Sequence, residues 1–278
     1  MLWRQKCPQR VFALRPGSRR PVTFDAKAAK MAESTKELTE AGAKVTTTVE
    51  GSDATASAPA ELSAKKGYWV IHILAIKNEE KFFAHLAHAN SKTKYGGKTR
   101  IFAPVQATLK GDPVAFCAVI EFPTVQAAID CWDDPEDYKE ARALLGDPET
   151  DVVDRRVCVI EADPLPELKL GQAFWINHVE TLHDQEKFWA YATASMPCFT
   201  SVTYGPVAHQ HVGAKKMGFA LVGGFESLQH GIGVYGGENE QYQKAREAGG
   251  MVEGEDHVVN RTICVIEYDP QYDKLVPK

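Results

Sequence analysis

Hydrophobic and polar positions recur in the same order twice along the chain. Residues 69–73 read Trp-Val-Ile-His-Ile, and residues 175–179 read Trp-Ile-Asn-His-Val, at an offset of 106. The run Cys-Val-Ile-Glu at 158–161 returns at 264–267 with the same offset. A register that survives over this distance indicates a duplicated unit.

Each unit has about 100 residues, which is enough for a modest hydrophobic core. We place the first repeat at 67–165 and the second at 171–272. In the first repeat, Asn78 is a plausible helix cap, Thr124 caps a second helix, and Pro135 interrupts it. The pattern predicts strand, helix, a hairpin of two strands, helix and strand, over residues 68–75, 78–95, 98–104, 114–122, 124–145 and 155–161.

The order β-α-β-β-α-β is the ferredoxin-like arrangement, with both helices on one face of an antiparallel sheet. Strand 114–120 is apolar on both sides, because Phe116 alternates with Cys117 and its other neighbours are also apolar. Both faces therefore need cover, and the second repeat can supply it. We predict an α+β fold in which two tandem ferredoxin-like units pack sheet to sheet as an intramolecular pseudo-dimer, with 162–170 as the connection.

Composition narrows the class of protein. Apolar residues make up 44% of the chain, and the net charge of −5 gives no reason to expect a nucleic-acid partner. No apolar run approaches the roughly 18 residues of a membrane span, so we expect a soluble protein without membrane insertion. The six cysteines show no Cys-x-x-Cys spacing. We interpret them as core residues of a protein in a reducing compartment.

The N-terminal segment differs from the repeats. Residues 1–24 carry six basic and no acidic residues, and they resemble a mitochondrial transit peptide. Residues 25–66 have no aromatic residue and are predicted to be a disordered linker. A mitochondrial location follows. The alternative is a start at Met31 and a cytoplasmic protein.

Four segments of the first repeat resemble the DUF1330 family of the dimeric α+β barrel superfamily. They are the opening Lys-Gly-Tyr-Trp at 66–69, Lys-Tyr-Gly-Gly-Lys at 94–98, Glu-Phe-Pro-Thr at 121–124, and the segment 132–138, in which Pro135 comes one residue early. The second repeat keeps the register but has no Tyr-Gly-Gly at the position equivalent to 95–97. The resemblance implies a barrel with a cleft between helices and sheet in each unit. The superfamily includes cofactor-independent monooxygenases, isomerases, cyclases and tandem haem proteins, so the resemblance alone does not define a reaction.

His72 is the candidate catalytic residue, as a general base or polar anchor in the cleft of the first repeat, since imidazole titrates near neutral pH. The candidate ligand-binding residues are Tyr95, Arg100, Trp132, Tyr138 and His178. Arg100 would bind a carboxylate or enolate, and the aromatic residues would shape the cleft. The alternative is structural: buried histidines with a hydrogen-bonded neighbour, and Trp132 and Tyr138 as core residues.

Other histidines give weaker signals. His209 and His211 lie on one face of a predicted strand, which is half of a metal site, but no cysteine or carboxylate completes it. His85 and His88 share a helix face in a polar context and are predicted to be solvated. The sequence has no Gly-x-Gly-x-x-Gly directly after a predicted strand, no complete Gly-x-x-x-x-Gly-Lys-Ser/Thr motif and no Gly-x-Ser-x-Gly, so nucleotide cofactors and serine hydrolysis are unsupported. We therefore predict neither a metal nor a cofactor.

The leading hypothesis is a small-molecule binding protein or cofactor-independent enzyme that acts on an aromatic or keto-acid ligand in the helix–sheet cleft of the first repeat. The first alternative is a non-catalytic assembly or interaction protein. The second is a haem-binding tandem barrel. Self-association beyond the intramolecular pseudo-dimer is left open.

Overall fold

The structure, a computed structural model, describes residues 65–88 and 91–272. The predicted leader at 1–24 and almost all of the predicted linker at 25–66 lie outside these ranges, so both remain predictions, as does the mitochondrial location. No helix within the described ranges is long and apolar enough to cross a membrane.

The first repeat contains four strands with helices between them. Its elements are β1 (Lys66–Ile76), α2 (Glu79–His88), α3 (Ser91–Lys94), β2 (Lys98–Lys110), β3 (Phe116–Phe122), α4 (Val125–Trp132), α5 (Asp137–Ala143), the short η1 (Glu149–Asp151) and β4 (Val153–Ala162). Where one helix was predicted to reach Tyr95, the structure describes two, α2 and α3, on either side of residues 89–90.

The second repeat follows the same order. Its elements are β5 (Ala173–Leu182), α6 (Gln185–Ser195), η2 (Met196–Cys198), β6 (Ser201–Val212), β7 (Phe219–Phe225), α7 (Leu228–Gly236), α8 (Glu240–Ala248) and β8 (Val259–Glu267). Equivalent side chains cap equivalent helices. Thr124 accepts a hydrogen bond from the backbone of α4, and Ser227 accepts one at the start of α7.

The eight strands form one closed antiparallel barrel in the order β1-β3-β2-β8-β5-β7-β6-β4. The predicted fold class is confirmed, with an addition that the sequence pattern did not contain. The two sheets also join edge to edge, because β2 pairs with β8 and β4 pairs with β6. Strand β2 extends beyond the predicted residue 104 to Lys110 because its last part pairs with β8 of the other repeat.

Strand alternation divides the core into three layers. Trp69 and Ile71 face the helices of the first repeat, whereas Tyr68 and Val70 point into the barrel together with residues of the second repeat. A third cluster fills the space between β5 and the helices of the second repeat. Each large apolar side chain buried in these layers contributes roughly 1.5–3 kcal/mol.

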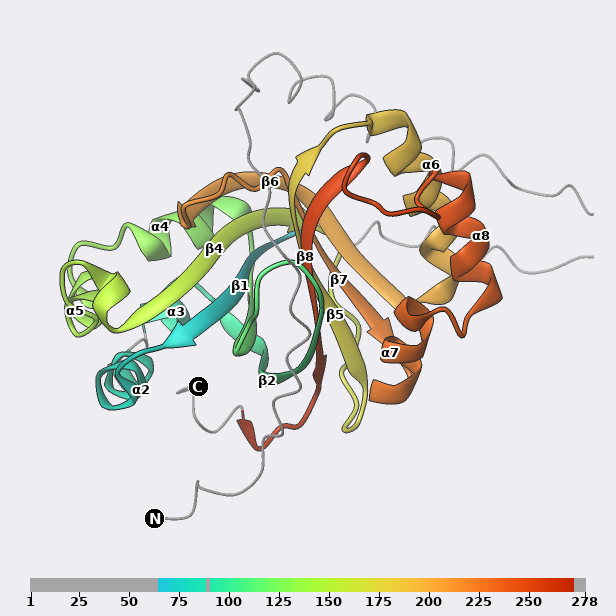
Figure 1. The fold of residues 1–278 in the computed structure, drawn as a ribbon. Helices are drawn as coiled ribbons and strands as arrows, with labels where there is room; N and C mark the ends of the chain where they lie inside the picture. The colour runs from blue at the N-terminus through green and yellow to red at the C-terminus, as the bar shows by residue number, and fades with distance from the viewer. Residues whose placement is uncertain (1–64, 89–90, 273–278) are drawn as a thin grey trace, which may run out of the picture. The chain divides into compact units, whose positions relative to one another are not determined.

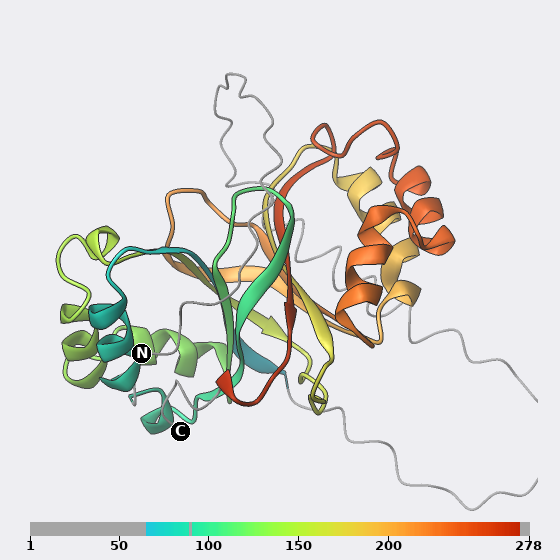
Figure 2. The same cartoon turned by 60° about the horizontal axis from the view of Figure 1, so that its bottom comes forward.

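In the ribbon views, the helices of each repeat lie outside the barrel against their own sheet (Figures 1 and 2). A tryptophan fixes one helix in each repeat. The indole of Trp69 donates to the Ala128 carbonyl of α4 at 2.9 Å, and that of Trp175 donates to the Gly231 carbonyl of α7 at 2.9 Å. These paired contacts hold a helix–sheet layer on each repeat.

The seam between β4 and β6 depends on a close backbone approach. A Cβ atom added at Gly205 would lie 2.3 Å from the Glu161 carbonyl oxygen. Because that neighbour is backbone, Gly205→Ala must shift the seam, and we expect a loss of about 1–3 kcal/mol in the free energy of unfolding, measured by urea titration. Gly236→Ala is the matched control, since a Cβ there meets nothing within 4 Å. Equal effects of the two substitutions would contradict this account of the seam.

Candidate functional site

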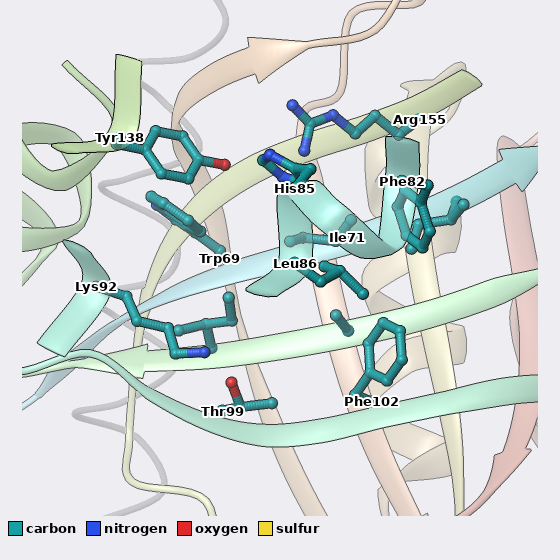
Figure 3. A pocket seen from close by; sticks show the side chains of 13 residues that line it. Trp69, Ile71, Phe82, His85, Leu86, Lys92, Thr99, Phe102, Tyr138 and Arg155 are labelled. Atoms are coloured by element: carbon teal, nitrogen blue, oxygen red, sulfur yellow. The ribbon is translucent and has the colours of Figure 1, made fainter. Parts of the chain in front are cut away.

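A small cavity lies between the sheet and the helices of the first repeat. Its volume is about 50 Å³. Most of the wall is apolar, and a few polar side chains reach it from different elements (Figure 3). The lining residues are Trp69, Ile71, Ile73, Phe82, His85, Leu86, Lys92, Thr99, Phe102, Ala118, Ile120, Tyr138 and Arg155.

Lys92, from the short helix α3, is the most unusual residue of this wall. Its side chain is only 3% exposed, and its Nζ has no hydrogen-bond partner among the described residues. Burial lowers the pKa of Lys92 to about 8. Thr99 Oγ1 and Arg155 Nε are likewise buried without a partner in this part of the chain. The cavity therefore contains three polar groups whose hydrogen-bonding capacity the protein does not use.

His85 contributes a neutral imidazole to the same wall. Its Nδ1 lies 2.9 Å from the Ala141 carbonyl oxygen, so this nitrogen carries the proton and Nε2 carries the lone pair. Burial, followed by the nearby charge of Arg155, lowers the pKa of His85 to about 4. The prediction of a solvated His85 is wrong, because α2 turns this face onto α5 rather than to solvent.

Arg155 is held by a partly buried carboxylate, that of Glu149. Its Nη2 donates to Glu149 at 2.8 Å, and Arg142 Nε donates to the other oxygen of Glu149 at 2.7 Å. Burial alone would raise the pKa of Glu149, but Arg155 and Arg142 lower it. Burial raises the pKa of Tyr138, and the nearby guanidinium of Arg155 opposes this shift. The far wall is therefore built around an ion-pair network of two arginines and one glutamate.

The equivalent cavity of the second repeat measures about 30 Å³. Tyr191 stands at the position equivalent to His85, and its hydroxyl lies 2.9 Å from that of Tyr242. Arg261 donates to Tyr191 at 3.0 Å and to Glu255 at 2.6 Å. Lysine is absent from the described lining, to which Phe199 adds an aromatic ring. Tyr191 and Arg261 thus have partners, whereas Asn177 Oδ1 and Trp189 Nε1 of the same lining are buried without one among the described residues. The second cavity differs from the first mainly in its smaller volume and in the absence of a lysine from its described lining.

The structure places His72 and His178 away from both cavities. They are fully buried inside the barrel, where their rings stack at 3.8 Å. The prediction that His72 lies in the helix–sheet cleft is wrong in its geometry, because strand alternation directs the adjacent Ile71 and Ile73 to the cavity instead. Burial, then the proximity of His72 and Arg156, keeps the pKa of His178 well below its ordinary value.

Of the other four candidates, Trp132 and Tyr138 pack against each other, with ring centroids 5.3 Å apart, whereas Tyr95 and Arg100 are each held by a different carboxylate. Tyr95 donates to Asp134 at 2.7 Å, and Arg100 is held by Glu121 at 2.5 Å. Trp132 stacks on His211 with ring centroids 4.3 Å apart, outside the cavity lining. Only Tyr138 of the predicted set reaches the cavity.

Sequence reasoning missed Lys92, Thr99, His85 and Arg155. One signal was available for Arg155, because it and Arg261 stand at equivalent positions within apolar strands of both repeats. A charge kept inside an apolar strand indicates a buried partner. Lys92 has no such signal, since a lysine between Ser91 and Thr93 resembles a surface position.

His209 and His211 lie beside each other on β6, with ring centroids 4.6 Å apart. Burial and the neighbouring His209 lower the pKa of His211 to about 3. Among the described residues, they belong to no group with a third metal-binding side chain. One group of suitable composition does exist, in the barrel interior, and consists of His72, Cys117 and Cys264.

Comparison with known proteins gives one family-model match, over the first repeat, and several distantly similar solved structures. No curated protein matches the chain. A protein of unknown function from Rhodopseudomonas palustris is 17% identical, covers 37% of this chain and 85% of its own, and has a TM-score of 0.30. A monooxygenase-like protein from Fusobacterium nucleatum is 10% identical, and the match covers 74% of this chain and 93% of that protein, with a TM-score of 0.45. An anthrone oxidase-like protein is 11% identical, and the match covers 74% of this chain and 92% of that protein, with a TM-score of 0.46.

The family match covers the repeat that contains the larger cavity. Residues 66–161 match the model described as "Domain of unknown function (DUF1330)". These bounds coincide with β1 through β4 to within one residue. The first repeat of this chain therefore belongs to the DUF1330 domain family.

Proposed function

We propose that the helix–sheet cavity of the first repeat binds a small, largely apolar molecule that carries an acidic oxygen, such as a phenol or a short keto acid. Lys92 supplies the counter-charge. This keeps the ligand class expected from the sequence but moves the polar anchor from His72 to Lys92.

The observation that carries the proposal is the unpartnered ammonium group of Lys92 in an apolar wall. Removing a charge from water without a partner is unfavourable by several kcal/mol. A bound carboxylate, phenolate or enolate would restore the missing interaction with a charge-assisted hydrogen bond. Thr99 Oγ1 and Arg155 Nε are further donors for the same ligand.

The walls limit the size and character of the ligand. Trp69, Phe82 and Phe102 offer aromatic surface around the polar groups (Figure 3). A cavity of about 50 Å³ has room for only a few water-sized groups. Compact ligands therefore fit without rearrangement, and longer ones require movement of the helices.

The same groups suggest a chemical role. Neutral His85 can accept a proton from a hydroxyl group or from carbon beside a carbonyl, and Lys92 can hold the oxyanion that forms. A base paired with a cation that holds the oxyanion is the arrangement that a cofactor-independent isomerase or cyclase requires. With its pKa near 4, His85 is a weak base, so the proposed function is ligand binding, with proton transfer as a secondary role.

Lys92→Met tests the anchor. The variant keeps an unbranched side chain of similar length but removes the charge, so affinity for phenols and β-keto acids should fall about 10-fold to 100-fold. The ligand-free variant should be more stable than the parent by about 1–3 kcal/mol, because an unsatisfied buried group has gone. Thermal shifts over a ligand panel and urea unfolding measure the two effects.

The exposed Lys98, next to α3 on β2, provides the matched control. Lys98→Met should change neither ligand affinity nor stability appreciably. A ligand panel without any thermal shift on the parent protein would reject the binding proposal. If such a protein also co-purified with a stoichiometric partner, the assembly alternative would take its place.

Titration of Lys92 should appear in the pH dependence of stability. Its pKa is about 8 in the folded chain against an ordinary 10.5, so the unfolded chain binds more protons between these values. The free energy of unfolding of the parent should therefore rise with pH across this interval relative to Lys92→Met, and the gap between the two should close. Anion affinity should fall as pH rises above about 8. A difference between the two proteins that is independent of pH would show that Lys92 does not titrate there.

A further inference from the structure

The barrel interior contains a cluster of soft donor atoms that the helix–sheet cavity does not use. His72 on β1, Cys117 on β3 and Cys264 on β8 each direct one such atom to a common region, and these three atoms all lie within 4.8 Å of one another. All three residues have no solvent exposure. The cluster thus combines side chains of both repeats.

The distances within the cluster are short. Cys117 Sγ lies 3.0 Å from Cys264 Sγ, and Cys264 Sγ lies 3.5 Å from His72 Nε2. The Ile176 carbonyl oxygen is 3.2 Å from His72 Nε2 and 3.4 Å from Cys264 Sγ. His72 Nδ1 has no hydrogen-bond partner among the described residues. Two thiols, an imidazole and a carbonyl oxygen therefore converge in an apolar interior.

A disulfide is the first alternative for two neighbouring thiols, but strand order disfavours it. Strand β2 lies between β3 and β8 in the barrel. Two interstrand spacings of about 4.8 Å put the two backbones roughly 9 Å apart, whereas a disulfide needs Cα atoms within about 6.8 Å. An atom placed between the sulfurs avoids this restriction.

We propose that His72, Cys117 and Cys264 form a binding site for a thiophilic cation, either monovalent copper or zinc. Thiolate and imidazole ligands favour both ions. Monovalent copper accepts the three side chains as a trigonal set. Zinc prefers four ligands, and the Ile176 carbonyl oxygen is the nearest candidate for the fourth.

Binding requires only proton release and no redox step. The two S–H bonds break, two sulfur–metal bonds form, and both protons pass to solvent. In the metal-free protein the His72 Nε2–H donates to the Ile176 carbonyl at 3.2 Å; on binding, the ring proton is transferred to Nδ1, and Nε2 becomes the ligand atom.

The pseudo-symmetric half of the barrel provides a built-in control. His178 Nε2 lies 3.7 Å from Cys158 Sγ, which repeats the pair formed by His72 and Cys264. The strand partner of His72 is Cys117, whereas the strand partner of His178 is Ala220. The second half thus lacks the third ligand, and the site is expected once in each chain.

The test uses the full chain, unfolded under anaerobic reducing conditions and refolded with cuprous ion or with zinc ion. After desalting in the presence of a competing chelator, we expect about one bound ion per chain in one of the two arms. X-ray absorption should show sulfur and nitrogen ligands. Cys117→Ala and Cys264→Ala should each weaken retention roughly 10-fold or more, whereas Cys158→Ala should retain the ion like the parent. Circular dichroism melts of the metal-free variants establish that each of them folds.

Three results would overturn the proposal. The first is equal retention by a folded Cys117→Ala, Cys264→Ala double variant. The second is the absence of bound ion from both refolding arms of the parent. The third is a Cys117–Cys264 cross-linked peptide after mild oxidation of the parent by peroxide, which would make the pair a disulfide. The cluster lies on the opposite face of the sheet from Lys92, so these outcomes do not depend on the ligand proposal.

Discussion

The structure depends on one constraint: both faces of each four-stranded sheet are apolar and must be shielded from water. Helices shield the outer face, through contacts such as Trp69 with α4. The inner face is shielded by the sibling sheet, and the edge pairings β2–β8 and β4–β6 close the body. Alternation along a strand then determines whether a side chain faces the helices or the barrel interior. On β1, Ile71 faces a cavity and His72 faces the barrel interior, although they are adjacent in sequence.

This constraint also explains how far the sequence could be interpreted. The duplication and the two-sided apolar strand at 114–120 were sufficient for the architecture, because both are properties of the pattern itself. The site was harder. Strand alternation puts His72 on the same face of β1 as Val70, but the sequence alone does not say which face the helices cover. Lys92 could not be found at all, since its burial results from α3 packing near α4 and α5 rather than from its neighbours in sequence.

The two repeats share a fold but differ in the side chains at their equivalent cavities. The pairs Arg155–Glu149 and Arg261–Glu255 remain equivalent, so the helix–sheet layer is held in the same way in both. Around that fixed pair, His85 is matched by Tyr191, and the described lining of the second cavity has aromatic rings and no lysine. In the barrel interior, Cys117 is matched by Ala220. A single polypeptide permits such asymmetry, because a substitution in one half is not imposed on the other, as it would be in a homodimer.

The seam pairing of β2 with β8 and of β4 with β6 also affects what counts as an autonomous folding unit. Residues 66–161 are the family domain, yet excision of this segment would leave β2 and β4 as bare edges and uncover the inner apolar face. Unpaired strand edges and an exposed apolar sheet face promote self-association or aggregation. The segment that matches the family is therefore shorter than the segment that folds cooperatively, which includes both repeats.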